Sequence, residues 1–178
     1  MTYRYTEAQQ EIRETILRIC ADFDDEYWLE KDRNGGFPHD LHKALADGGW
    51  LGIALPEEVG GAGLGITEAA IMMQAIAESG SGASGASAIH MNIFGLNPVV
   101  KFGTSVQKQR MLVPLLEGRE KACFAVTEPT TGLDTTKLKT WASHRVTGMW
   151  SMARRSGFQP RRWRTRCCCW PGPRRLKR

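Results

Sequence analysis

Apolar residues near the start of the chain recur at the spacing of a helix with one buried face. Between Thr6 and about Asp24 they fall at offsets of four, seven, eight and eleven residues, at Ile12, Ile16, Ile19, Cys20 and Phe23. Thr6 and Gln9 have the spacing of a capping box, in which each side chain bonds an unpaired amide of the first turn. This stretch predicts an amphipathic helix that packs on other elements.

Further helices are predicted up to about residue 118. Their ranges and start signals are a helix over 38–47, a helix over 67–78, a start at Asn97-Pro98 and a capping box at Thr104 with Gln107. Residues 79–88 are nearly all Gly, Ser and Ala, and the apolar run that follows favours close packing or a ligand's approach over a linker. The glycine-rich stretch 56–65 lacks a P-loop's Gly-Lys-Ser/Thr ending, so we expect a turn there rather than a phosphate site.

A strand-like apolar run appears only at 122–127. Helices followed by the opening of a β-rich unit predict a mainly α fold class. The expected division is a helical domain over 1–118, the start of a β-domain over 119–140, and a basic tail over 141–178 that we expect to be disordered.

Charge divides the chain at about the same place. Residues 1–140 hold 13 Lys plus Arg against 19 Asp plus Glu, which gives 13 − 19 = −6, whereas the last 38 residues hold 11 basic residues and no acid. The net charge of +5 therefore averages two unlike segments. It does not indicate a specific nucleic-acid-binding or membrane-binding protein.

The sequence predicts a cytoplasmic protein. No apolar run approaches the roughly 20 residues that cross a bilayer, and the start of the chain lacks a signal peptide's apolar region. Cys20 and Cys123 stand alone among apolar residues, as reduced thiols do. We expect no metal at the adjacent cysteines 167–169, because adjacent thiols rarely chelate one tetrahedral ion. The histidines form no catalytic constellation and are expected to be structural or surface residues: His39, His42, His90 and His144.

Three segments resemble the acyl-CoA dehydrogenase family. They are Pro-Glu-Glu-Val-Gly-Gly-Ala-Gly-Leu-Gly at 56–65, the segment from Phe-Gly-Thr to Leu-Glu-Gly at 102–118, and Cys-Phe-Ala-Val-Thr-Glu-Pro-Thr-Thr-Gly at 123–132. The resemblance spans residues 5–140. It implies a homo-oligomeric enzyme of three domains that binds FAD, desaturates an acyl-CoA thioester between its α and β carbons and passes electrons to a partner. A flavin monooxygenase of the same superfamily is an alternative.

The resemblance also implies roles for individual residues. Phe124, Val126 and Thr127 match positions that contact the isoalloxazine ring through backbone groups and the threonine hydroxyl. Leu133 matches a position near cofactor and substrate at which many members have serine, and Asp134 matches the acid that follows. A leucine cannot donate a hydrogen bond, which implies a different acyl-CoA preference. No residue of this chain corresponds to the family's catalytic glutamate.

The text after Thr140 departs from the family abruptly. If each codon is read from its third base, residues 149–151 give Val-Val when serine uses a TCN codon, and 167–170 must give Leu-Leu-Leu. The recovered text resembles the continuation of the family's β-domain, which predicts a one-base slip between about 141 and 147. We expect such a chain to be inactive. The alternative is a helical interaction module whose basic tail binds nucleic acid or acidic partners.

Overall fold

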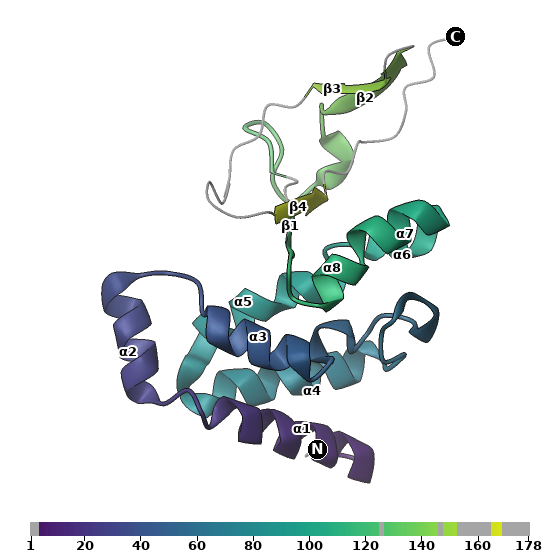
Figure 1. Cartoon of the computed structure of the whole chain (residues 1–178). Helices are drawn as coiled ribbons and strands as arrows, with labels where there is room; N and C mark the ends of the chain where they lie inside the picture. Colours follow the sequence, from purple (N-terminus) through teal and green to yellow (C-terminus); the bar gives the residue numbers. More distant parts are fainter. Residues whose placement is uncertain (1–3, 125–126, 146–147, 153–164, 169–178) are drawn as a thin grey trace.

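The computed structural model describes residues 4–124, 127–145, 148–152 and 165–168. Helices come first along the chain and strands follow (Figure 1). The helices are α1 (Glu7–Cys20), α2 (Asp25–Asn34), α3 (His39–Asp47), α4 (Ile66–Ile76), α5 (Gly82–Phe94), α6 (Asn97–Phe102), α7 (Ser105–Met111) and α8 (Val113–Leu116). Short helical turns are η1 (Trp50–Gly52), η2 (Glu57–Val59), the π-helical η3 (Ala77–Ser81) and η4 (Thr135–Lys137). The mainly α fold class is confirmed.

Helix α1 forms as its sequence predicts. The Thr6 hydroxyl accepts from the Gln9 amide at 3.2 Å, and the Gln9 side chain accepts from the Thr6 amide at 3.2 Å. Its apolar face is buried against α4, and Gln9 Nε2 adds a 2.9 Å bond to Glu68. The capping box at Thr104 also forms, with bonds of 2.8 and 3.3 Å to Gln107.

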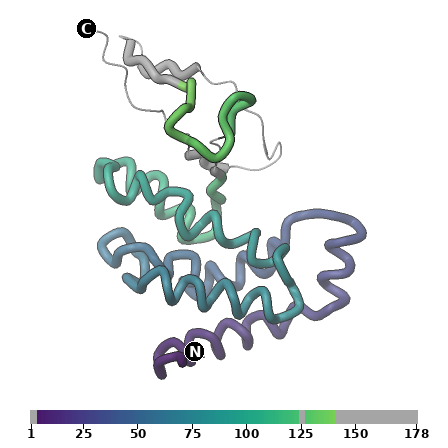
Figure 2. The backbone as a smooth tube through the Cα atoms, turned by 180° about the vertical axis from the view of Figure 1, so that it is seen from behind, coloured from purple at the N-terminus to yellow at the C-terminus, as the bar shows by residue number. Residues whose placement is uncertain are grey.

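Two apolar clusters hold the helices together. The larger one joins α1, α3, α4 and α5, and its fully buried members include Ile16, Leu41, Leu45, Met72, Ile76 and Ile89. The smaller one joins the loop after η1 to α6, the α7–α8 turn and the first strand, through Leu55, Leu96, Val100, Leu112, Leu115 and Ala122. Helix α1 lies at one end of this stack and the strands lie at the other (Figures 1 and 2).

The small-residue stretch is helical and closely packed. Helix α4 passes through η3 into α5, and the change of direction is made at Gly80, whose φ of 101° is a value that glycine adopts easily. Helix α5 then packs along α4 and contacts α3. The predicted helix over 67–78 is therefore α4 with the first residues of η3.

Helix α2 has no counterpart among the helices that the sequence predicts. It begins at a cap in which Asp24 accepts from the Tyr27 amide at 3.0 Å, and none of its residues is buried. Tyr27 and Trp28 pack against the larger apolar cluster, but the apolar residues of α2 are consecutive, at 27–29, and so show no helical period. The turn expected at 56–65 is observed as η2. Gly61 follows it where a Cβ would lie 2.1 Å from the Leu55 carbonyl oxygen.

Four short strands follow the helices. β1 (Lys121–Phe124) pairs in parallel with β4 (Thr165–Cys168), and β2 (Trp141–Arg145) pairs antiparallel with β3 (Gly148–Met152). Three of these strands lie in the segment that the sequence predicts to be disordered. Among the described residues, no helix has the length and apolar character needed to cross a membrane.

Candidate functional site

Strand β1 carries the chain from the helices into the candidate site. It follows the turn at Gly118 and packs on α5. The Ala122 side chain is buried in the smaller apolar cluster, while the Ala122 amide donates to Asn92 Oδ1 of α5 at 3.5 Å. Both contacts attach the strand to the helical unit, so the position of whatever follows β1 depends on α5.

The segment 127–140 is a loop closed by one buried carboxylate. Glu128 is buried and accepts from the backbone amides of Lys139 at 2.7 Å and Thr140 at 2.8 Å, and from the Thr140 hydroxyl. Its own backbone exchanges two bonds of 3.1 Å with Thr131. Hydrogen bonds to an ionised acceptor are about twice as strong as neutral ones. The carboxylate therefore fixes both ends of the loop to each other.

The tip of the loop has its own support. The Thr131 hydroxyl donates to the Lys137 carbonyl at 3.1 Å, and Asp134 accepts from the Thr136 amide at 3.2 Å at the start of η4. An ion pair of 3.1 Å joins Asp134 to Lys137. The Thr136 hydroxyl also donates to Asp134, and this bond first, then the contact with Lys137, holds the pKa of Asp134 below its usual range. The acid after Leu133 therefore shapes the loop.

The residues implied by the resemblance occupy different environments. Phe124 is the last residue of β1, and Thr127 is exposed at the start of the loop. Val126 lies outside the described residues. Leu133 is fully exposed at the loop tip, where its side chain presents apolar surface to solvent. The described part thus brings an exposed hydroxyl and an exposed apolar side chain onto one rigid loop.

A buried polar cluster lies beneath β1, and the sequence gives no sign of it. His42 Nε2 lies 2.9 Å from Asn92 Nδ2, and each side chain is only 2% exposed. The Phe37 ring lies 5.4 Å from the His42 ring, and Lys121 Nζ lies 4.7 Å from the Phe37 centroid. Burial first, then the charges of Lys121 and His39, lower the pKa of His42 to about 4. A single histidine on an apolar helix face carries no sequence signal for such a contact.

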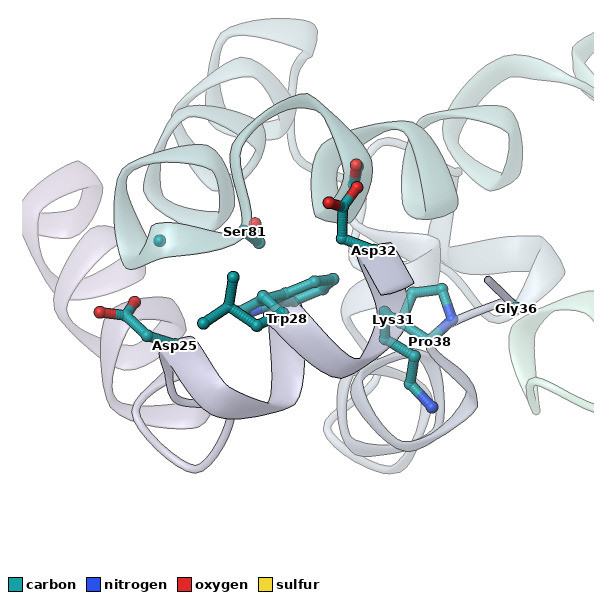
Figure 3. A pocket seen from close by; sticks show the side chains of 10 residues that line it. Asp25, Trp28, Lys31, Asp32, Gly36, Pro38 and Ser81 are labelled. Atoms are coloured by element: carbon teal, nitrogen blue, oxygen red, sulfur yellow. The ribbon is translucent and has the colours of Figure 1, made fainter. Parts of the chain in front are cut away.

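A groove opens elsewhere, between α2 and the junction of η3 with α5. Figure 3 shows Trp28 across its middle, with Asp25 and Asp32 on either side, and its volume is about 540 Å³. The indole nitrogen of Trp28 donates to the Phe23 carbonyl at 3.1 Å. The lining mixes charges with apolar surface and holds no nucleophile paired with a base. Among the described residues, no group of three or more His, Cys, Asp or Glu could hold a metal ion.

Several known proteins match this chain in sequence and in fold. A family model for the acyl-CoA dehydrogenase N-terminal domain matches residues 6–119. Acyl-CoA dehydrogenase FadE12 of Mycobacterium tuberculosis is 34% identical over 143 residues, which cover 77% of this chain and 35% of that protein. A probable acyl-CoA dehydrogenase from Mycobacterium abscessus is 28% identical, with a TM-score of 0.70 over 77% of this chain and 36% of that one.

A flavoprotein structure is similar as well. It is described as the electron transferring flavoprotein of Acidaminococcus fermentans, and its matching chain is 28% identical with a TM-score of 0.68. That match covers 80% of this chain and 37% of the other. The chain thus spans about a third of the length of the curated relatives that it matches.

Proposed function

Because the chain belongs to the acyl-CoA dehydrogenase family, we propose that the protein it represents desaturates an acyl-CoA thioester between the α and β carbons with FAD. The observation that carries this proposal is the loop at 127–140. There the motif Thr-Glu-Pro-x-x-Gly begins at Thr127, three residues after Phe124 of β1, and a buried glutamate fixes the loop. The family's division into a helical domain over 1–118 and a β-domain that begins at 119 is part of the proposal.

The described residues fit a planar cofactor with a polar edge. Thr127 is exposed, so its hydroxyl is available to a ligand, and the backbone at Phe124 ends the strand just before it. The Glu128 carboxylate holds the loop in place before any ligand arrives, which lowers the entropy cost of binding. When bound, FAD supplies the acceptor for the hydride that leaves the β carbon. Val126 completes the set by family resemblance.

We propose acyl-CoA as the substrate class, with Leu133 near the reacting end. Its exposed side chain offers apolar surface where a serine would offer a hydrogen bond. A bound ligand would bury that surface, so leucine favours an apolar portion of the acyl group at this point. A homo-oligomer and an electron-transfer partner belong to the same proposal, supported by the likeness to a flavoprotein that transfers electrons.

We further propose that the 178-residue chain as written does not perform this reaction. Its segment 141–178 carries +11 and no acid, and its shifted reading restores family-like text. The helical unit and the loop would then be in frame, while the rest of the flavin site would be replaced by unrelated residues.

Sequencing of the source DNA across codons 135–178, on both strands, tests the frame. We expect one base more or fewer than the present text implies. The protein from the restored frame should bind FAD and show a flavin absorption band, whereas the 178-residue chain should be colourless. A yellow 178-residue chain would contradict its proposed inactivity. Retention on DNA that is lost when 141–178 are deleted would support the interaction module instead.

A matched pair of variants in the restored protein tests the loop. Thr127→Ala removes the proposed hydrogen bond to the cofactor and should weaken FAD binding about fivefold. Thr130→Ala changes the same residue type at another exposed position of the loop and should leave FAD affinity unchanged. Equal affinities for the two variants would remove Thr127 from the cofactor site.

A further inference from the structure

One buried hydrogen-bonded chain links three elements that are distant in sequence. His42 on α3 contacts Asn92 on α5 at a separation of 50 residues, and Asn92 contacts the Ala122 amide of β1 at a separation of 30. Both side chains are buried among the apolar residues of the helical unit. A buried polar group without a partner costs about 1–3 kcal/mol, so these partners constrain one another.

The donors and acceptors along this chain allow one arrangement. The backbone amide of Ala122 can only donate, so the Asn92 oxygen must face it. The Asn92 NH₂ group therefore faces His42 and donates to its Nε2. An accepting Nε2 carries no proton, which places the proton of the neutral imidazole on Nδ1.

Protonation of Nε2 would disrupt this arrangement of hydrogen-bond donors and acceptors. Two donors would then face each other at 2.9 Å, and Asn92 could relieve the clash only by turning its oxygen toward His42. The turned amide would present NH₂ to the Ala122 amide, which is again donor against donor. The charged groups that act on His42 are Lys121 of β1 and His39 of α3, and both oppose the protonated form together with burial.

We propose that His42 and Asn92 are positioning residues that hold β1 on the helical unit, and that they do so only while Nε2 of His42 is unprotonated. The bond they control lies two residues before Phe124, where β1 ends. The consequence for FAD rests on the proposed function, because β1 leads to Thr127. The attachment of β1 to the helical unit does not rest on the proposed function.

The first test uses the unaltered 178-residue chain labelled with ¹⁵N at pH 7. Long-range ¹H–¹⁵N spectra distinguish a protonated ring nitrogen from one that accepts a hydrogen bond. We expect Nδ1 of His42 to be protonated and Nε2 to be an acceptor. A protonated Nε2 would overturn the proposal, and no variant is needed to see it.

The second test follows the Ala122 amide signal as the pH falls. In the unaltered chain the chemical shift of this amide should change over the same pH range as the signals of the His42 ring, near pH 4. The side chain of His42→Gln can still offer an oxygen to Asn92 but does not titrate. In this variant the chemical shift of the Ala122 amide should therefore lack the transition, and its hydrogen-exchange protection should be kept. His90→Gln, a matched control at a half-buried histidine of α5, should show the same transition as the unaltered chain. The same transition in His42→Gln would overturn the proposal.

The third test removes the intermediate group. Asn92→Leu should lower the hydrogen-exchange protection of the Ala122 amide roughly fivefold, the loss of one ordinary hydrogen bond. Unchanged protection in a folded Asn92→Leu chain would count against the positioning role. If the restored protein bound no FAD while all three readouts held, the proposed function would fail and this inference would stand.

Discussion

The helical unit from Glu7 to Leu116 and the loop at 127–140 differ in what holds them in place. The helices surround two apolar clusters in which Leu, Ile and Met side chains are fully buried. The loop buries Glu128, Thr131 and Thr140 and leaves Leu133 fully exposed. Apolar packing is spread over many residues, whereas the loop depends on a few hydrogen bonds, above all those that the Glu128 carboxylate accepts from three donors.

This difference separates stability from site geometry. Burial of apolar area is non-directional and adds over many side chains, so it sets the overall free energy of unfolding. Hydrogen bonds to one carboxylate are directional and set the shape of a short segment. Changes in the helical unit should therefore unfold the protein, and changes at Glu128 should loosen the site while the helices stay folded.

The largest effect is expected in the larger apolar cluster. Leu45→Ala removes a side chain that is 0% exposed and should lower the free energy of unfolding by about 3 kcal/mol, because a cavity remains. Urea denaturation followed by circular dichroism measures it. Leu29→Ala, the same change at a leucine that is 45% exposed, should cost less than about 1 kcal/mol. Similar losses of unfolding free energy in both variants would show that burial in the larger apolar cluster does not determine the stability.

The next effect is a dependence on acid that comes from His42. Its pKa is about 4 in the folded protein against an ordinary value of 6.5, so between these values the unfolded chain binds the extra proton. This contribution to stability is complete above pH 6.5 and is lost as the pH falls toward 4. The loss is on the order of 3 kcal/mol.

Urea midpoints measured from pH 7 to 4.5 test this expectation. His42→Gln should flatten the pH dependence, because glutamine does not titrate. His90→Gln, at a half-buried histidine outside the His42–Asn92 contact, should leave it unchanged. If His42→Gln and the unaltered chain lost stability in parallel, other groups would account for the acid sensitivity.

A smaller and local effect is expected at Glu128. Glu128→Gln removes the charge that accepts from the amides of Lys139 and Thr140, which should favour opening of the loop by about 2 kcal/mol. Hydrogen exchange at those two amides should quicken roughly thirtyfold, with little change in the urea midpoint. Asp134→Asn, at an exposed acid of the same loop, should affect only the Thr136 region. If the amides of the helices exchanged as fast as those of Lys139 and Thr140 in the Glu128→Gln variant, the two regions would not be separate in stability.

The smallest expected effect concerns the cap of α1. Thr6→Ala leaves the Gln9 amide without its side-chain acceptor and should cost about 1 kcal/mol, measured as a shift of the thermal midpoint. Thr67→Ala changes an exposed threonine in the first turn of α4, where Gly65 rather than Thr67 is the cap, and should be nearly neutral. A neutral Thr6→Ala would mean that packing on α4 alone defines the start of α1.

Helix boundaries with a local cause are those that the sequence predicts well. The capping boxes at Thr6 and Thr104 form as expected, and the helix predicted over 38–47 is α3. Helix α2 is missed because its apolar residues are consecutive, at 27–29, and show no helical period, although Tyr27 and Trp28 pack on the larger apolar cluster. The π-helical turn η3 is missed because small residues signal close approach without saying which chain approaches.

The candidate site likewise has a part that the sequence predicts and a part that it does not. The motif at 123–132 resembles the family's flavin-contacting segment, and that role stays a prediction for this chain. The structure places Phe124 at the end of β1 and Thr127 at the start of the loop. The sequence gives no role to Glu128, although its carboxylate organises the loop. Its bonds to Lys139 and Thr140 span 11 and 12 residues, a separation that no local pattern encodes.

The sequence by itself determines the helical block, its capping boxes, the family and the change of composition near residue 140, because each of these depends on neighbouring residues. Only the tertiary structure decides that His42, Asn92 and Ala122 meet beneath β1 and that Glu128 closes the loop. Such contacts join residues tens of positions apart, and they exist only after the apolar clusters have brought the elements together. Their partners are then fixed by the high cost of leaving a buried polar group unpaired.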